Sequence, residues 1–290
     1  MIAVDLGQSG CRISIEGKIH SSNRGKFAGE SVLVSLEENF KNLQASSELV
    51  ALSLTGLFGY VDDPNPYLQL CTKYFGAKEV AVIDDGLASL AGSLAGKPGV
   101  ALTLGGGVVA VGGNGSTLSH SDGLGSVFGD EGGGFWLGSR GLTRALAARD
   151  GREDSPELLK LFEDALTAFD ALSSKNGTEA NSLAISCAKS VLEADLEITK
   201  QIVSEGARYL ANTVLSAWKK VGSINEPFKL TISGGLSKNA NYRQLIFDNI
   251  KLQGAKTDLI EAVGDNLDGA IWIALNQKED IAPMLGWARA

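Results

Sequence analysis

The sequence predicts an α/β protein with about two domains. Apolar runs of strand length alternate with amphipathic helical stretches, which is the pattern of sheets covered by helices. A length of 290 residues corresponds to about two domains, each long enough to bury its own core. Residues 2–15 and 100–113 share one plan, in which a turn of small residues joins two apolar strands. They predict two β-hairpins.

Between the two hairpins, further strands and helices follow in turn. Residues 32–36 fit either a short strand or the start of a helix that runs to about residue 46, and the pattern leaves both open. The apolar runs 50–54 and 80–83 predict buried strands. The second of them leads into a predicted helix of small residues at about 86–95. Lys97, Pro98 and Gly99 then break that helix and mark a domain boundary.

From about residue 131 onward the chain is mostly helical. The apolar run 230–233 predicts one strand in this part. Periodic apolar residues predict helices at about 131–149, 156–171, 178–192, 195–220, 237–250 and 265–277.

Composition narrows the class of partner. The net charge of −8 and the lack of a basic run argue against nucleic acid and anionic membranes as partners, which leaves small molecules. The chain starts with a strand rather than a leader pattern, and no apolar stretch approaches the ~20 residues of a membrane span, so we expect a cytoplasmic protein. Cys11, Cys71 and Cys187 are scattered, which predicts buried thiols rather than a disulfide framework or a metal site.

The glycine turns of the two hairpins are candidate phosphate-binding elements. Glycine lets backbone N–H groups approach an anion that a Cβ atom would keep away. Ordinary hairpins also use glycine, so one such turn alone fits a structural role better. The repetition, together with Asp5 at the end of a buried strand, favours a polyphosphate with a hydrated Mg²⁺ ion near that carboxylate.

Two loops that follow predicted strands carry polar groups. Asp84 and Asp85 stand at the carboxyl end of a strand and at the start of a helix, where ligands collect in open α/β sheets. Either acid could instead cap the helix, although a cap requires only one of them. Thr55 and Gly56 form a small polar loop that fits both an ordinary turn and a site for a hydroxylated ligand.

The segment 123–138 contains seven glycines and an acid pair, Asp130 and Glu131, where a helix is predicted to begin. Helix capping accounts for one of the acids. Three consecutive glycines at 132–134 weaken a helix by up to about 1 kcal/mol each relative to alanine, which indicates that something approaches this backbone closely. Later, Gly234 and Gly235 follow the strand 230–233 and suit a platform for an adenosine, although any strand-to-helix turn has this appearance.

Together these motifs resemble the sugar kinase, heat-shock chaperone and actin superfamily, and within it the N-acetylglucosamine kinase and benzoyl-CoA-reductase-type ATPase branch. The most specific match is the acid pair Asp130–Glu131 between glycines and before an aromatic pair. The resemblance implies a two-domain actin-like ATPase (ribonuclease H-like) fold with an interdomain active-site cleft. It implies an N-terminal domain of residues 1–97 completed by a C-terminal helix at about 265–290, and a C-terminal domain of residues 98–264, with hinges near 97–99 and 264.

The same resemblance implies transfer of the γ-phosphoryl group of ATP to the 6-hydroxyl of N-acetylglucosamine or glucosamine. Asp5 would hold Mg²⁺ through its waters, and Asp85 would be the catalytic carboxylate. An acid-lined cleft would also attract a cationic amino sugar. The implied nucleotide-binding residues are Gly7, Gln8, Ser9, Gly105, Gly106, Gly107, Gly234 and Gly235, and the implied sugar-binding residues are Thr55, Gly56, Asp130 and Glu131.

The chain departs from the family pattern at several positions. In the second phosphate motif, Gly106 and Val108 replace hydroxyl-bearing residues, and residues 21–30 do not match the asparagine-bearing sugar loop. Because a glycine scaffold without those hydroxyls can still bind ligands, a non-catalytic sugar or nucleotide sensor stays open as an alternative. A reductase-activating ATPase is a second alternative, but it needs a cysteine pair that shares a cluster across a dimer. The resemblance also leaves room for a homodimer.

Overall fold

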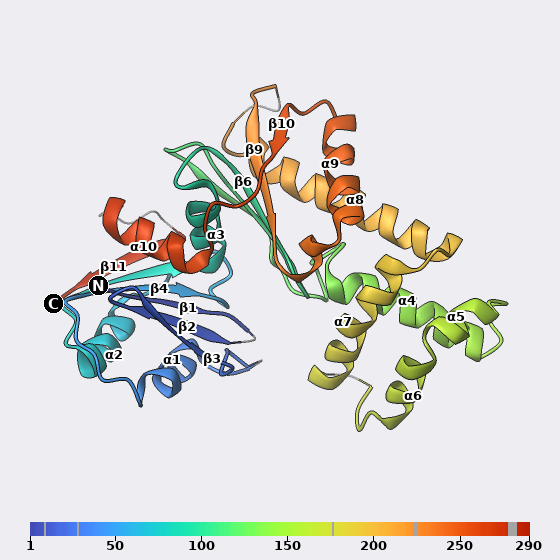
Figure 1. The fold of residues 1–290 in the computed structure, drawn as a ribbon, viewed down its shortest axis with the longest axis horizontal. Coiled ribbons are helices and arrows are strands. Elements are labelled where there is room, and N and C mark those ends of the chain that lie inside the picture. The colour runs from blue at the N-terminus through green and yellow to red at the C-terminus, as the bar shows by residue number, and fades with distance from the viewer. Residues whose placement is uncertain (9, 28, 176, 223–224, 278–282) are drawn as a thin grey trace. The chain divides into compact units, whose positions relative to one another are not determined.

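The computed structural model describes residues 1–8, 10–27, 29–175, 177–222, 225–277 and 283–290 (Figure 1). These residues form two compact units. Unit 1 comprises residues 1–101, 113–118 and 260–290, and unit 2 comprises residues 102–112 and 119–259.

Unit 1 contains a six-stranded sheet with the strand order β11-β5-β4-β1-β2-β3. The three central strands β5, β4 and β1 are parallel, whereas β2, β3 and β11 each run antiparallel to a neighbour. Their bounds are β1 Ile2–Leu6, β2 Cys11–Ile15, β3 Lys18–Ser22, β4 Leu49–Leu54, β5 Glu79–Asp84 and β11 Leu285–Arg289.

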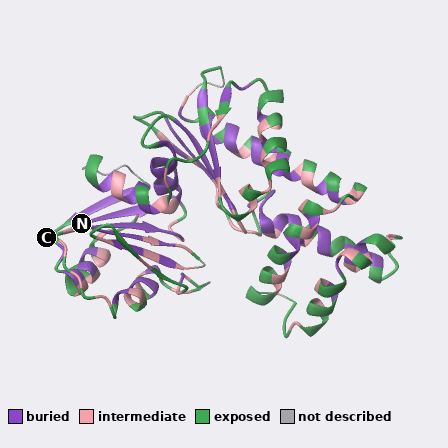
Figure 2. Ribbon diagram, in the orientation of Figure 1, coloured by how far each residue is buried: buried purple, intermediate pink, exposed green. Residues whose placement is uncertain are grey.

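The two faces of this sheet differ in character. On one face, large apolar residues such as Leu6, Leu52 and Val82 pack against α1 (Val32–Phe40) and α2 (Asn65–Phe75). Alternate positions of the same strands point to the other face, which α3 (Asp85–Leu94) and α10 (Asn266–Asn276) cover (Figure 1). The central strands are buried almost throughout (Figure 2). Asp5 alternates with Val4 and Leu6 of the apolar face, so its side chain lies on the second face.

A five-stranded sheet with the order β10-β9-β6-β7-β8 lies mainly in unit 2. Its strands are β6 Gly99–Leu104, β7 Val108–Gly113, β8 Leu118–Asp122, β9 Phe228–Ser233 and β10 Thr257–Leu259. The helices of unit 2 are α4 Gly134–Arg149, α5 Pro156–Leu161, α6 Glu163–Ala171, α7 Thr178–Glu193, α8 Glu197–Lys219, η1 Gly235–Lys238 and α9 Ala240–Leu252. In the part of the chain that the structure describes, no helix has the length and apolarity needed to span a bilayer.

The structure confirms the α/β class and both hairpins, and it corrects four helix predictions. The C-terminal helix implied at about 265–290 ends at Asn276, and Leu285–Arg289 is the strand β11, whose backbone pairs with β5. Residues 32–36 open helix α1, which ends at Phe40 instead of near 46, because Leu43 N donates to Phe40 O at 3.0 Å and turns the chain. The helix expected at 156–171 divides into α5 and α6 at Phe162, a buried residue with a non-helical φ of −110°. The helix expected from 131 begins at Gly134, because Gly132 before it has a φ of +85°.

Glycine lets α4 lie very close to α7, which gives a stability prediction. A Cβ atom at Gly138 would stand 1.8 Å from the carbonyl oxygen of Ala184, a backbone atom that cannot move aside cheaply. In an open helix, Gly→Ala stabilises by up to about 1 kcal/mol. We expect Gly138→Ala to destabilise instead, by about 1–3 kcal/mol from overpacking. Urea denaturation measures this, with Thr143→Ala on the exposed face of α4 as the control.

A stabilising effect of Gly138→Ala would contradict the close packing of α4 on α7. The Thr143→Ala control changes a residue on the same helix without entering that contact. It therefore separates the steric effect from the change in helix propensity, which also favours alanine at position 143.

Candidate functional site

The carboxyl ends of the parallel strands of unit 1 bring several predicted site residues together. Asp5 of β1 is in register with Ser53 of β4, and Leu54 is in register with Asp84 of β5. Thr55 follows β4 and donates its backbone N–H to Leu6 O at 3.0 Å. The loops that leave β1, β4 and β5 therefore start at one edge of the sheet, as expected for a ligand site in an open α/β sheet.

Asp5 is held by an arginine that the sequence reasoning did not single out. Arg12 donates to Asp5 Oδ2 from Nη2 at 2.7 Å and from Nε at 3.2 Å, and Ser53 Oγ donates to Asp5 Oδ1 at 3.2 Å. Arg12 Nη1 also contacts Asp265 Oδ2 at 2.5 Å. Asp265 caps α10 by accepting from Leu267 N, so one guanidinium links β1 to the start of that helix.

The side chains around Asp5 suit an Mg²⁺ ion that keeps most of its waters, rather than a metal ion held entirely by protein ligands. The described residues contain no group of three or more histidine, cysteine or acidic side chains that could hold a metal. Mg²⁺ bound to a nucleotide usually keeps several waters and needs only one or two carboxylates beside the phosphates. Asp5, with a side chain 13% exposed, can supply such a carboxylate.

The two adjacent acids at the start of α3 have different surroundings. Asp84 is buried, and its carboxylate accepts hydrogen bonds from Gly86 N at 3.0 Å and from Gly59 N at 2.8 Å. Asp84 is therefore the helix cap. Asp85 is partly buried, and burial, followed by the charge of Asp84 and then that of Asp5, raises its pKa to about 7, although a hydrogen bond with the Thr55 side chain opposes the shift. A carboxyl group with that pKa can exchange a proton at neutral pH.

The turn between β1 and β2 is packed under a second loop. Gly7 N donates to Gly10 O at 2.9 Å, and the side chain of Gln8 is exposed. Ser9, the third predicted residue of this turn, lies outside the described residues. A Cβ atom at Gly25 would stand 2.3 Å from Gln8 O, so residues 24–26 lie directly against the turn.

Lys26 belongs to that loop, and the sequence reasoning missed it. Its N–H donates to Gly7 O at 2.9 Å, and its side chain crosses Gly56, where a Cβ atom would stand 2.7 Å from Lys26 Cε. Gly56 has a φ of +82°, so glycine is favoured there for its backbone as well as for space. The only signal in the sequence was the failure of residues 21–30 to match the sugar loop of the family.

In unit 2, the glycine turn 105–107 between β6 and β7 is tied to the start of α4. Gly134 N donates to Gly105 O at 2.8 Å, and Phe135 N donates to Gly106 O at 2.9 Å. Asp130 Oδ1 accepts from Val108 N at 2.9 Å, directly after the turn. The second predicted phosphate turn and the predicted acid motif therefore form one structure.

Asp130 and Glu131 do not share one environment. Asp130 is 9% exposed, and burial raises its pKa. A Cβ atom at Gly107 would stand 2.7 Å from Asp130 Oδ2, so that oxygen faces the glycine turn. Glu131 is exposed.

The close approach expected at glycines 132–134 is made by the protein itself. A Cβ atom at Gly132 would stand 2.6 Å from Gly206 O of α8, and Tyr242 Oη donates to Gly132 O at 2.8 Å. A Cβ atom at Gly134 would stand 3.0 Å from Gly105 O. Packing thus accounts for these glycines without a ligand on them.

Gly234 and Gly235 also differ in how closely other atoms approach them. A Cβ atom at Gly234, where φ is +97°, would stand 2.4 Å from Leu104 O, so this glycine packs against the end of β6. Gly235 has no atom near its Cβ position and faces a cavity of about 530 Å³, a volume typical of small-molecule sites. The cavity is lined by Lys189, Leu192, Glu193, Gly235, Leu236, Lys238, Asn239, Ala240 and Asn241.

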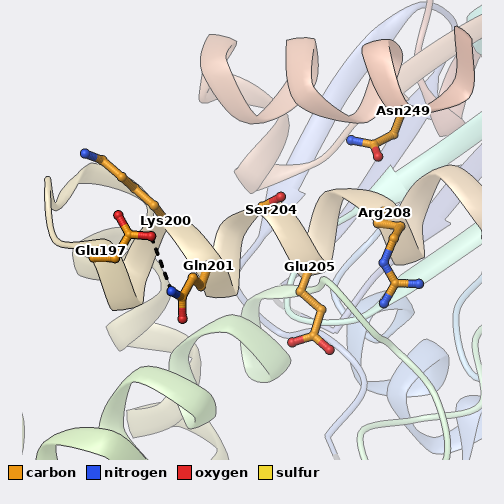
Figure 3. Close-up of a pocket in the computed structure, with 7 residues that line it drawn as sticks. All are labelled: Glu197, Lys200, Gln201, Ser204, Glu205, Arg208 and Asn249. Atoms are coloured by element: carbon orange, nitrogen blue, oxygen red, sulfur yellow. Dashed lines mark hydrogen bonds between the residues drawn. The ribbon is translucent and has the colours of Figure 1, made fainter. Parts of the chain in front are cut away.

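A second hollow of unit 2, of about 510 Å³, involves none of the predicted site residues. It lies along α8, and Asn249 of α9 faces it (Figure 3). Its walls carry both charge signs, and Gln201 Nε2 donates to Glu197 Oε1 at 3.3 Å within it. The lining residues are Glu197, Lys200, Gln201, Ser204, Glu205, Arg208 and Asn249.

Comparisons with known proteins agree with this architecture. The sequence profile described as the BadF/BadG/BcrA/BcrD ATPase family matches residues 10–275. The N-acetylmuramic acid/N-acetylglucosamine kinase of Clostridium acetobutylicum is 28% identical over 213 residues, which are 69% of this chain and 68% of that protein.

Two solved structures show the likeness in fold. A candidate N-acetylglucosamine kinase of Chromobacterium violaceum is 21% identical with a TM-score of 0.66, over 94% of this chain and 98% of that one. A ROK family glucokinase of Streptomyces griseus, solved with glucose and AMPPNP, is 18% identical with a TM-score of 0.53, over 93% of this chain and 97% of that one. They confirm the predicted actin-like ATPase fold.

Proposed function

This chain belongs to the BadF/BadG/BcrA/BcrD ATPase family, and we propose that it is a cytoplasmic kinase that transfers the γ-phosphoryl group of ATP to the 6-hydroxyl of an amino sugar, N-acetylglucosamine or glucosamine. The observation that carries the proposal is the position and environment of the Asp85 carboxyl group. It stands at the carboxyl end of a parallel strand, its pKa is raised to about 7, and the neighbouring acid, not Asp85, caps the helix.

In this reaction Asp85 accepts the proton of the attacking sugar hydroxyl, and Thr55 orients its carboxylate through their hydrogen bond. Asp5 would hold a hydrated Mg²⁺ ion, and Arg12 and Ser53 fix the position of that carboxylate. Mg²⁺ supplies neutralisation of the charge on the transferring phosphoryl group. Because the transition state is loose, positioning and charge compensation are the main tasks of the protein.

Unit 2 contributes nucleotide contacts and two acids. The glycine turn 105–107 approaches the phosphates at Gly105, which has open space at its Cβ position, and the cavity beside Gly235 takes the adenosine. Gly234 supports that cavity through its packing on Leu104. Asp130 binds sugar hydroxyls, because a carboxylate oxygen accepts strongly from O–H donors, and exposed Glu131 adds a second acceptor.

The choice of an amino sugar as acceptor is supported by the names of similar proteins. The relative from Clostridium acetobutylicum is a kinase for N-acetylmuramic acid and N-acetylglucosamine, and a protein of similar fold is a candidate N-acetylglucosamine kinase. The role of a reductase activator is disfavoured because Cys11, Cys71 and Cys187 are all buried, and burial raises the pKa of Cys11 and Cys71 to about 12.

A screen for sugar-dependent ADP release tests the proposal. We expect ADP release from Mg·ATP to rise on addition of N-acetylglucosamine, glucosamine or another amino sugar, and to rise less with neutral hexoses. Mass spectrometry of the product then locates the phosphate. ADP release that no sugar stimulates, with sugar and nucleotide both binding by calorimetry, would replace the kinase by the sensor.

A further inference from the structure

Side-chain hydrogen bonds hold the loop that carries Lys26 in one conformation. Glu30 accepts from Arg24 Nη2 at 2.5 Å and from Ser35 Oγ at 2.6 Å, and Asn39 Nδ2 donates to Arg24 O at 2.9 Å. The Arg24 guanidinium also lies 4.4 Å from the centroid of the Phe27 ring. Glu30, the acid of this loop, therefore already has Arg24 and Ser35 as partners.

Lys26 itself lies against the loop that carries the predicted sugar-binding residues. Its Nζ has no hydrogen-bond or ion-pair partner in the described part of the chain. A Cβ atom at Gly56 would stand 3.3 Å from Nζ, so this cation is beside the residue that follows Thr55. Thr55 in turn shares a side-chain hydrogen bond with Asp85, so the ammonium group of Lys26 lies beside the loop that contacts the candidate base.

We propose that Lys26 binds a carboxylate substituent of the substrate, so that the enzyme takes an acidic amino sugar in preference to a neutral or cationic one. The inference rests on the proposed function and names its substrate class. Asp84 and Asp85 would repel a carboxylate on the acceptor, and a cation beside Gly56 offsets that repulsion. The same cation disfavours the ammonium group of glucosamine.

A carboxylate is a better partner than the transferring phosphoryl group for two reasons. The side chain of Lys26 lies over Gly56 in the loop after β4, which carries Thr55, rather than over the glycine turn of β1 and β2. The phosphates are already provided with glycine turns and with Asp5-bound Mg²⁺ in the proposed function. A role on the phosphoryl group is an outcome that the experiment separates.

The experiment compares N-acetylmuramic acid with N-acetylglucosamine, since the two differ by a lactyl carboxylate at the 3-oxygen and both keep the 6-hydroxyl. Lys26→Met should lower kcat/KM for N-acetylmuramic acid by at least about tenfold, mainly through KM, with a much smaller effect on N-acetylglucosamine. Lys26→Arg should retain most of the preference. Lys18→Met, a change at an exposed lysine of β3, is the matched control and should alter neither value.

An equal loss with both sugars would overturn the inference and assign Lys26 to the phosphoryl group or to loop structure. If Lys26→Met leaves kcat/KM for both sugars unchanged, the inference is overturned as well. Calorimetry with each sugar in the absence of nucleotide keeps the two proposals separate: if no sugar is phosphorylated but Lys26→Met still weakens N-acetylmuramic acid alone, the kinase proposal fails and the carboxylate site stands.

Discussion

Asp85→Asn should lower kcat by about 10²–10⁴-fold, the usual contribution of a general base, while the fold and most of the nucleotide affinity remain. The asparagine side chain keeps the volume and one oxygen acceptor for the Thr55 hydroxyl but cannot take a proton. Steady-state kinetics and calorimetric binding of ADP measure the two quantities. A loss of less than tenfold would remove Asp85 from the role of base.

Asp84→Asn is the matched control, because the two acids are adjacent but differ in partners. Asp84 accepts from Gly59 N and Gly86 N, and an amide has only one oxygen for these two donors. We expect Asp84→Asn to lose about 1–3 kcal/mol of stability through an unsatisfied buried group, with a smaller effect on kcat than Asp85→Asn. Equal kinetic losses in two stably folded variants would contradict the division of roles.

The pKa of Asp85 also sets a pH dependence. A base works in its deprotonated form, so kcat/KM should rise with pH and level off above the pKa of about 7. Stability should move in the opposite direction, since a carboxyl group whose folded pKa is raised favours folding when protonated. Its contribution is full below the ordinary pKa of 3.8 and is lost as pH rises through about 7. Asp85→Asn should therefore gain stability relative to the native chain at pH 8.

Most of the architecture could be predicted because it follows from local patterns. The hairpins, the buried strands β4, β5 and β9, and the long helices α7 and α8 have the periodicity or glycine turns of their type. The strands β3, β8 and β10 were missed for a physical reason, whereas β11 lies where the resemblance implied a C-terminal helix. β3 and β8 are polar and partly exposed, and β10 has three residues, so their pairing depends on a partner strand rather than on their own sequence.

The residue types of the candidate site could be predicted from the sequence, but the role of each residue could not. The residue pattern left open which of Asp84 and Asp85 caps the helix, while the resemblance implied Asp85 as the catalytic carboxylate. The hydrogen bonds from Gly59 and Gly86 identify Asp84 as the cap. The contacts of Arg12 with Asp5 and Asp265 join residues 253 positions apart at their widest, a separation that no local pattern encodes. The same holds for Lys26, whose importance lies in its contact with Gly56.

Asp130→Ala should raise the KM for the sugar far more than the KM for ATP, by about 10-fold or more, because it removes a charged acceptor of sugar hydroxyls. Asp130 also accepts from Val108 N and faces Gly107, so alanine loosens the glycine turn as well. Asp130→Asn separates the two effects, since its amide oxygen can still accept from Val108 N while the charge is gone. If Asp130 binds the sugar, both variants raise the sugar KM and asparagine leaves the KM for ATP unchanged. If the KM for ATP rises most in Asp130→Ala and asparagine restores it without affecting the sugar, Asp130 acts on the phosphate turn and not on the sugar.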